Sequence, residues 1–285
     1  MSLGDVLIIG GDSNIGKRLC VLYKSHGLNV ITTTRKQESV NQNNIFLDLS
    51  QDTSKWEVPS FNIKIAFFCA SITSIDFCNK NPDYTKLVNV INTVSLIKKI
   101  TKLGVYIIYI SSNTVFDGNT PFAKGNDFRN PKTEYGKQKV LVENEISKLG
   151  DNIGIVRVSK VLSNSIPLFN NWISELKKGN EIRAYNDMYF SPISFDFFIE
   201  SLFMITQMKL SDIIQISASN QISYFDAIMY LSKKYQINES LIITRSYKQD
   251  DINFSPNYTT LDCSRLINLG ILMPNSYESL IQFID

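Results

Sequence analysis

Val6-Leu7-Ile8-Ile9-Gly10-Gly11-Asp12-Ser13-Asn14-Ile15-Gly16 is the stretch of sequence that decides the fold. Its four leading apolar residues predict a buried strand, and a helical pattern follows at once over Asn14–His26. A glycine-rich turn between a first strand and a first helix lets the backbone approach a pyrophosphate, and the helix N-terminus adds free N–H groups and a partial positive charge. The stretch therefore predicts the phosphate turn of a dinucleotide-binding fold.

The turn departs from the usual pattern at its middle position. Gly10 and Gly16 fit the tight turn and the close helix packing, whereas Ser13 stands in place of the middle glycine and could itself bond phosphate. An ordinary strand–helix turn is the alternative reading of these residues alone. The residues predicted to contact the cofactor here are Gly10, Ser13, Asn14, Ile15 and Gly16.

The rest of the first 160 residues repeats the alternation of short apolar runs and helical patterns. This rhythm predicts an α/β fold with a doubly wound parallel sheet, the Rossmann architecture, over residues 1–160. The expected strands are Val6–Ile9, Val30–Thr33, Ile45–Leu47, Ile65–Cys69, Val105–Ile110 and Ile153–Val156, and the expected helices are Asn14–His26, Asp83–Leu103 and Thr133–Leu149.

Residues 161–285 lose this rhythm. They predict a smaller mixed α/β substrate-binding portion, from which the chain crosses back to the sheet. The expected helices are Pro167–Lys178, Phe195–Met208 and Tyr224–Tyr235, and two isolated strands are expected at Ile213–Ser217 and Leu241–Arg245.

Composition excludes several classes of function. Lys and Arg number 29 against 27 Asp and Glu, so neither a nucleic-acid-binding tail nor a membrane-surface patch is expected. No apolar run approaches the roughly 20 residues that a membrane span needs, and no signal peptide is expected before the first predicted strand. With four scattered cysteines and one histidine, no metal site is expected, and free thiols suggest a reducing cytoplasm.

The end of the second predicted strand bears on coenzyme choice. An NAD-selective fold usually places an acid there to bind the ribose 2′-hydroxyl, but the residues are Thr34, Arg35 and Lys36. The two cations could meet the 2′-phosphate of NADP through charge-assisted hydrogen bonds, or they could face solvent. The sequence leaves NADP and NAD open and leans towards NADP.

Tyr135 and Lys139 open the helix that follows the fifth strand. Residues four apart share one helical face, so both side chains can enter the same cleft. A tyrosine that exchanges a proton near neutral pH must shift its pKa of about 10 by about 3 units, or roughly 4 kcal/mol. A nearby ammonium group would do this, and Ser112, at the carboxyl end of the fifth strand, could donate to a substrate carbonyl.

On these motifs the chain resembles the extended short-chain dehydrogenase/reductases, and within them the dTDP-4-dehydrorhamnose reductase-like family of sugar-nucleotide reductases and epimerases. The resemblance runs through nearly the whole chain, from Gly10–Gly16 to Asn257–Gly270. It carries over Ser111–Gly118 as the family's STDYVFDG segment, Pro131–Lys139 as its P-x-x-x-YGxxK segment and Asn89 as its helix asparagine.

The resemblance implies roles for these residues. Ser112, Tyr135 and Lys139 would form the catalytic triad of an NAD(P)H-dependent reductase of a nucleotide-linked keto-deoxy sugar, with Tyr135 as the general acid. Cofactor contacts would also come from Thr34, Arg35, Asp48, Leu49, Cys69, Ala70, Ser71, Tyr135 and Lys139. A homodimer is a further expectation, because the helices with Asn89 and Tyr135 often form dimer faces in the superfamily.

The departures from the family fall near the sugar. Asn113 and Thr114 replace Asp-Tyr, Lys160 replaces an aromatic residue, and Ile193 replaces a threonine, so Asn113 and Lys160 are the candidate substrate contacts. Three alternatives stay open: a 4-epimerase with retained NAD, a catalytically silent cofactor-binding regulatory subunit, and, with less support, a 4,6-dehydratase. A dehydratase needs a carboxylic acid where Asn113 and Thr114 stand, and a Rossmann-like methyltransferase would leave the Tyr/Lys helix unexplained.

Overall fold

The computed structural model describes residues 5–59, 62–162, 167–250, 252 and 254–282. Its internal contacts divide the chain into two compact units. The first comprises residues 1–115, 129–157 and 199–214, and the second comprises residues 116–128, 158–198 and 215–285. The chain thus crosses between the units several times, once close to residue 160.

A seven-stranded sheet forms the centre of the first unit, and it confirms the predicted doubly wound architecture. Its strand order is β11 (Asp212–Ile216), β6 (Ile153–Val158), β5 (Tyr106–Ser112), β4 (Ile63–Phe68), β1 (Asp5–Ile9), β2 (Val30–Thr34) and β3 (Asn44–Phe46). The pairs from β3 to β5 are parallel. Strand order reverses between β1 and β4, the switch point beside which such sheets bind ligands.

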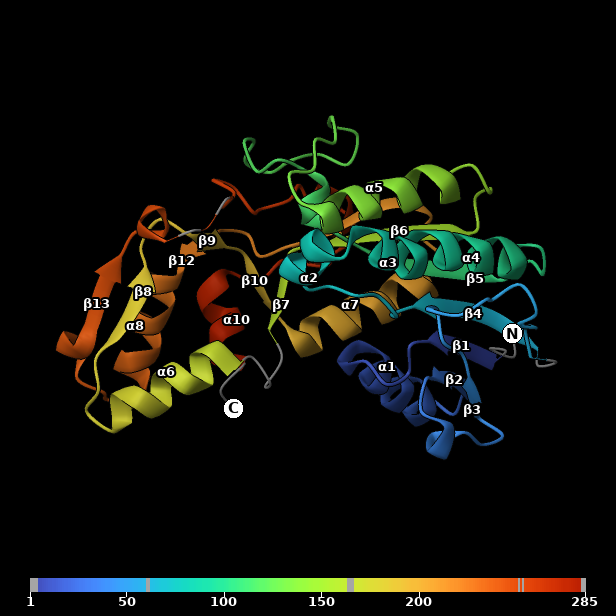
Figure 1. The fold of residues 1–285 in the computed structure, drawn as a ribbon, viewed down its shortest axis with the longest axis horizontal. Helices are drawn as coiled ribbons and strands as arrows, with labels where there is room; N and C mark the ends of the chain where they lie inside the picture. Colours follow the sequence, from blue (N-terminus) through green and yellow to red (C-terminus); the bar gives the residue numbers. More distant parts are fainter. Residues whose placement is uncertain (1–4, 60–61, 163–166, 251, 253, 283–285) are drawn as a thin grey trace. The chain divides into compact units, whose positions relative to one another are not determined.

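Helices cover both faces of this sheet (Figure 1). They are α1 (Asn14–Ser25), α2 (Ile75–Lys80), α3 (Pro82–Lys86), the π-helical turn η2 (Leu87–Asn92), α4 (Thr93–Thr101), α5 (Glu134–Ile146) and α7 (Phe195–Gln207), with 3₁₀ turns η1 (Gln37–Ser39) and η3 (Asn113–Val115). Helices α3, α4 and α5 lie over one face, and α1 and α7 over the other. The buried phenol of Tyr23 on α1 hydrogen-bonds Thr206 on α7 at 2.5 Å.

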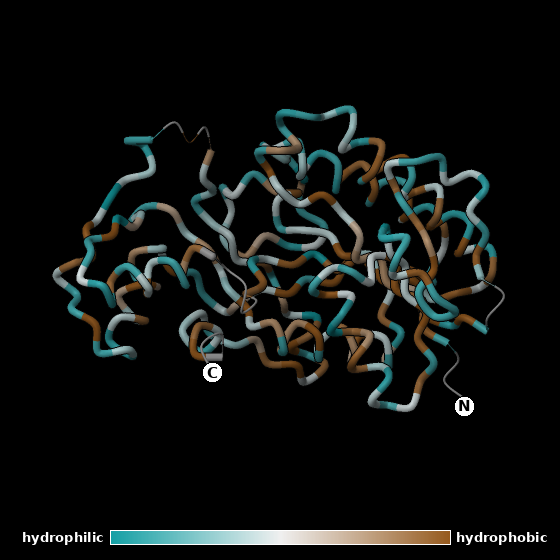
Figure 2. Tube along the Cα trace, turned by 60° about the horizontal axis from the view of Figure 1, so that its bottom comes forward, coloured by the Kyte–Doolittle hydropathy of each residue, from teal (hydrophilic) through white to brown (hydrophobic). Residues whose placement is uncertain are grey.

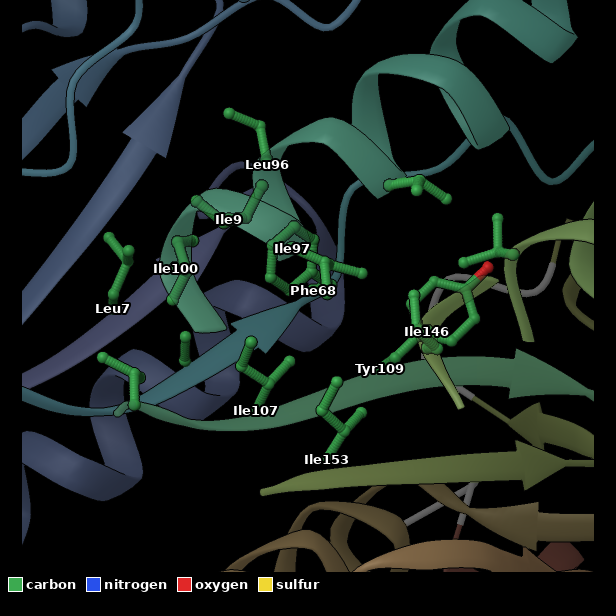
Figure 3. Packing of buried hydrophobic residues seen from close by; sticks show 14 of the residues in the cluster. Leu7, Ile9, Phe68, Leu96, Ile97, Ile100, Ile107, Tyr109, Ile146 and Ile153 are labelled. Atoms are coloured by element: carbon green, nitrogen blue, oxygen red, sulfur yellow. The ribbon is translucent and has the colours of Figure 1, made fainter. Parts of the chain in front are cut away.

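The core of this unit lies between the sheet and the α4–α5 layer. Strand side chains such as Ile9, Phe68 and Ile107 pack against Ile97 and Ile100 of α4 (Figure 3). Burial on both faces explains why these strands read as near-continuous apolar runs rather than as alternating patterns. In Figure 2 many of the connecting loops are hydrophilic, as solvent-facing connections require.

The second unit is built from helices and three two-stranded sheets, β10-β7, β12-β9 and β13-β8. Its elements are β7 (Lys160–Leu162), α6 (Pro167–Lys177), β8 (Ile182–Tyr185), β9 (Tyr189–Phe190), β10 (Pro192–Ser194), β12 (Ile222–Ser223), α8 (Tyr224–Lys234), η4 (Glu239–Leu241), β13 (Ile242–Arg245), η5 (Tyr247–Gln249), α9 (Ser264–Ile267) and α10 (Ser276–Gln282). Phe169, Phe190 and Tyr224 stack in its core.

The two strands expected to be isolated both have partners. The one predicted at Ile213–Ser217 is β11, the edge of the main sheet, and the one predicted at Leu241–Arg245 is β13, which pairs in parallel with β8. Their neighbours are distant in sequence, so local patterns could not show the pairing. In the part of the chain that the structure describes, no helix is long and apolar enough to cross a bilayer.

Candidate active site

The glycine turn closes tightly between β1 and α1. Gly10 has φ +89°, and a Cβ there would lie 2.6 Å from the backbone nitrogen of Ala70. A Cβ on Gly16 would lie 2.3 Å from the Gly10 carbonyl oxygen. Both positions therefore require glycine, and the turn approaches the end of β4 as closely as a backbone can.

Ser13 serves this turn as the N-cap of α1. Its hydroxyl accepts a hydrogen bond from Gly16 N at 3.0 Å and donates one to Gly10 O at 2.8 Å. At the position where the usual motif has its middle glycine, Ser13 thus caps the helix and satisfies one of its free N–H groups. The Ser13 hydroxyl and the Ser13 backbone N–H both donate to Gly10 O, so the predicted bond from Ser13 to a phosphate would require one of these donors to turn away from the turn.

A pocket opens above this turn and collects most of the predicted cofactor residues. Its lining includes nine of them: Gly10, Ser13, Thr34, Arg35, Asp48, Leu49, Cys69, Ala70 and Ser71. It also includes residues that the sequence did not single out, namely Ile9, Asp12, Thr33, Leu47, Ser50, Ile72 and Val88. Five predicted contacts lie outside this lining: Asn14, Ile15 and Gly16 in the first turn of α1, and Tyr135 and Lys139 on α5.

The chemistry of the lining fits a dinucleotide. A glycine turn at a helix N-terminus suits a pyrophosphate, Leu47 and Leu49 supply apolar surface for an adenine ring, and Asp48 supplies an acceptor. Asp48 is held in place because its carboxylate accepts from the Ser50 backbone N–H at 2.9 Å and from the Ser50 hydroxyl at 2.8 Å.

The helix that carries Tyr135 and Lys139 begins with a side-chain cap. The Thr133 hydroxyl accepts from Gly136 N at 3.1 Å and fixes the first turn of α5. A Cβ on Gly136 would lie 2.2 Å from the carbonyl oxygen of Thr114. The glycine after Tyr135 therefore lets α5 contact the segment that follows Ser112, and this contact brings the three predicted catalytic residues into one region of the first unit.

Lys139 is buried and directed at β5. Its ammonium donates to the Ile110 carbonyl oxygen at 2.8 Å and lies 5.4 Å from the centroid of the Tyr135 ring. Burial lowers the pKa of Lys139 to about 8, against the opposing effect of the Glu143 carboxylate. The lysine is therefore still largely protonated at neutral pH.

The pKa of Tyr135 is shifted in the opposite direction to the one that its spacing to Lys139 predicts. Its side chain is buried, and that burial raises the pKa of the phenol, despite a hydrogen bond with Ser71 that lowers it. Loss of hydration outweighs the nearby ammonium, which hydrogen-bonds a backbone carbonyl. In this state the phenol stays protonated at neutral pH, the form that a proton donor requires.

Ser112 ends β5 and is 9% exposed. Its hydroxyl oxygen accepts from the Thr114 hydroxyl at 3.0 Å and from the Thr114 N–H at 3.2 Å, and the hydroxyl points to the Asn113 side-chain oxygen at 3.4 Å. The predicted substrate contact Asn113 therefore adjoins Ser112. The other one, Lys160, is the exposed first residue of β7 in the second unit, where it pairs with Pro192.

Two buried polar networks support these side chains, and the sequence analysis missed most of their members. Glu143 lies one helical turn after Lys139 and accepts from Ser111, Arg157 and Arg129. Both Glu143 and Arg157 are 1% exposed. The spacing of Tyr135, Lys139 and Glu143, each four residues apart, was the available signal.

The second network is centred on Asn89, in the π-helical turn η2. Its side chain accepts from Ile72 N at 2.8 Å and from the Ser71 hydroxyl at 3.1 Å, and it donates to Ile72 O and to the Gln138 side chain. Asn89 thus joins the loop after β4, which lines the pocket, to the helix that carries Tyr135. Among the described residues, no cluster of three or more His, Cys, Asp or Glu could hold a metal ion.

Comparison with known families covers almost the entire chain. The model of the RmlD substrate binding domain matches residues 4–284. The chain belongs to this family.

Individual relatives are distant. The spore coat polysaccharide biosynthesis protein SpsK of Bacillus subtilis is 24% identical over 98% of this chain and 96% of its own length. Methionine adenosyltransferase 2 subunit beta of Xenopus tropicalis is 22% identical over 75% of this chain and 67% of its own length. The Bacillus anthracis dTDP-4-dehydrorhamnose reductase in complex with NADP superposes with a TM-score of 0.85, at 20% identity, over 100% of this chain and 98% of that one, and so shares the fold.

Proposed function

We propose that this chain is an NAD(P)H-dependent reductase of a nucleotide-linked keto-deoxy sugar, with Tyr135 as the general acid, acting in the cytoplasm. The observation that carries the proposal is the buried pair on α5, in which the Lys139 ammonium lies 5.4 Å from the Tyr135 ring. Family membership and the glycine-turn pocket add support, since this family includes sugar-nucleotide reductases.

The proposed chemistry assigns each side chain one task. The bound coenzyme supplies the hydride. Burial keeps Tyr135 protonated, and its phenol gives that proton to the carbonyl oxygen of the sugar as negative charge develops there. Lys139 stabilises the resulting phenolate by its charge, and the Ile110 carbonyl holds its ammonium in place.

Ser112 and its neighbours orient the sugar in this proposal. The Ser112 hydroxyl would turn from Asn113 to the substrate oxygen, a small rearrangement because that hydrogen bond is long at 3.4 Å. Asn113 and Thr114 replace the Asp-Tyr of rhamnose-type reductases, and Lys160 replaces an aromatic residue. We therefore expect a sugar-nucleotide other than dTDP-4-dehydrorhamnose to be the preferred substrate.

The test compares wild type with Tyr135→Phe. Consumption of external NADH or NADPH is followed by absorbance with dTDP-4-dehydrorhamnose and other nucleotide-linked keto sugars. We expect turnover by wild type and a loss of about 100-fold or more in the variant, the usual contribution of a general acid. Coenzyme binding by the variant should be preserved. Equal turnover by both proteins would exclude Tyr135 as the acid.

A second candidate is a coenzyme-binding subunit without turnover of its own. The similarity to methionine adenosyltransferase 2 subunit beta favours it, because that protein is named as part of a larger assembly. This candidate predicts that wild type and Tyr135→Phe both bind the coenzyme and that neither consumes it. An epimerase with retained NAD likewise consumes no external coenzyme, but it interconverts two nucleotide sugars and loses that activity with Tyr135→Phe.

A further inference from the structure

Asp12 belongs to the glycine turn by sequence, but its carboxylate lies at the end of β2. Its Oδ2 accepts from the Thr34 hydroxyl at 2.7 Å. The same hydroxyl oxygen accepts from Lys36 N at 3.0 Å, so its single proton is directed to Asp12. Asp12, Thr34 and Arg35 all line the pocket.

Three hydrogen bonds hold the turn against β2 and fix this position. Besides the Asp12–Thr34 bond, Gly10 N donates to the Thr33 hydroxyl and Gly11 N donates to the Thr33 carbonyl, both at 2.9 Å. A Cβ on Gly11 would lie 2.6 Å from the Cβ of Thr32. Glycine at position 11 therefore permits the close approach that brings the carboxylate of the next residue to the strand end.

The end of the second strand is where dinucleotide folds discriminate between coenzymes. An acid there accepts from the ribose 2′-hydroxyl of NAD, whereas a cation there accommodates the 2′-phosphate of NADP. This chain has no acid on the strand end itself, but Asp12 supplies one from the neighbouring turn. A carboxylate accepts hydrogen bonds and donates none, so it pairs with a hydroxyl and repels a phosphate.

Arg35 and Lys36 would favour the 2′-phosphate of NADP and so oppose the effect of Asp12. The difference between them is that the Asp12 carboxylate is held in place and the two cations are not. Both cationic side chains are exposed, where solvent and salt screen their charge. The Asp12 side chain is also exposed, but Thr34 holds its carboxylate in one place. An acceptor already fixed at the ribose position loses little entropy on binding, whereas a mobile cation must be ordered first.

We propose that Asp12 selects the coenzyme of this protein and makes it prefer NADH to NADPH. The inference rests on the proposed function, since it assumes that the pocket holds a nicotinamide dinucleotide. It assigns to the turn the role that the second strand has in other dinucleotide folds.

The test measures dissociation constants of NADH and NADPH by calorimetry on the complete chain, without substrate. We expect wild type to bind NADH about tenfold more tightly, the factor that corresponds to one hydrogen bond to a charged group. Asp12→Asn and Asp12→Ser should lower the ratio of the NADPH to the NADH dissociation constant by about tenfold. Thr34→Val, which removes the tether, should shift that ratio in the same direction by a smaller factor.

A matched control is Asp52→Asn, which removes the same charge from an exposed carboxylate outside the pocket lining and should leave the ratio unchanged. The inference is overturned if wild type prefers NADPH, or if the Asp12 variants keep the wild-type ratio while both coenzymes bind. Either of these two results leaves the proposed function intact. Failure of wild type to bind either coenzyme overturns the proposed function and the inference together.

Discussion

A Cβ at Gly136 would lie 2.2 Å from the carbonyl oxygen of Thr114, so α5 meets the segment after Ser112 backbone to backbone. This contact sets the distance between the helix that carries Tyr135 and Lys139 and the strand end that carries Ser112. Any side chain at position 136 must move one of the two.

Gly136→Ala should therefore disturb both stability and activity. Overpacking against backbone typically costs about 1–3 kcal/mol, and we expect a loss of that size in the free energy of unfolding in urea. Turnover should fall by more than coenzyme affinity, since neither Gly136 nor Thr114 lines the pocket. The neighbouring Lys137→Ala, at an exposed position, should unfold like wild type. Equal stability of the two variants would show that the helix does not depend on this contact.

Glu143 provides a second test, of the buried charge network beneath Lys139. Glu143→Gln removes the charge that pairs with the buried Arg157 guanidinium, and breaking such a buried pair costs about 3–5 kcal/mol. Chemical denaturation should show this loss. The control is Glu145→Gln on the exposed side of α5, where the carboxylate pairs with Lys98 and Lys148 in solvent. An unfolding midpoint for Glu143→Gln close to that of the control would mean that stability does not depend on the Glu143 carboxylate.

The lowered pKa of Lys139 predicts a pH dependence of stability. Burial lowers the pKa to about 8 in the folded protein, whereas a lysine in the unfolded chain titrates near its ordinary value of about 10.4. Between these values the unfolded chain binds more protons, so the free energy of unfolding rises with pH across this window. Relative to Lys139→Met, wild type should gain about 2 kcal/mol between about pH 8 and about pH 10. A constant difference between the two proteins across this range would contradict the lowered pKa.

The sequence predicted the sheet well, for a physical reason. Strands buried on both faces must be apolar throughout, and Val6–Ile9 or Val105–Ile110 show this without knowledge of their neighbours. The short strands of the second unit, such as β9 and β12, escaped prediction because two residues carry no period. The place of β11 at the sheet edge depends on pairing with β6, which no local pattern encodes.

The candidate site was partly predictable. The spacing of Tyr135 and Lys139 is enough to place them on one helical face. The glycines of the turn likewise indicate that another part of the backbone approaches closely. Asp12 was not predicted as this acid because dinucleotide folds usually carry it on the second strand, whereas here it reaches the strand end from a separate turn. The raised pKa of Tyr135 was also missed, since residue spacing reports the nearby ammonium but not the depth of burial.

The most direct test of the central claim follows the hydride itself. The protein is incubated with a nucleotide-linked keto-deoxy sugar and NADH or NADPH that carries deuterium at the transferable position of its nicotinamide, and the product sugar is examined by NMR. The account predicts deuterium on the former carbonyl carbon of the sugar in wild type and almost none with Tyr135→Phe. A product without deuterium, or recovery of both the sugar and the coenzyme unchanged across a panel of such sugars, would contradict it.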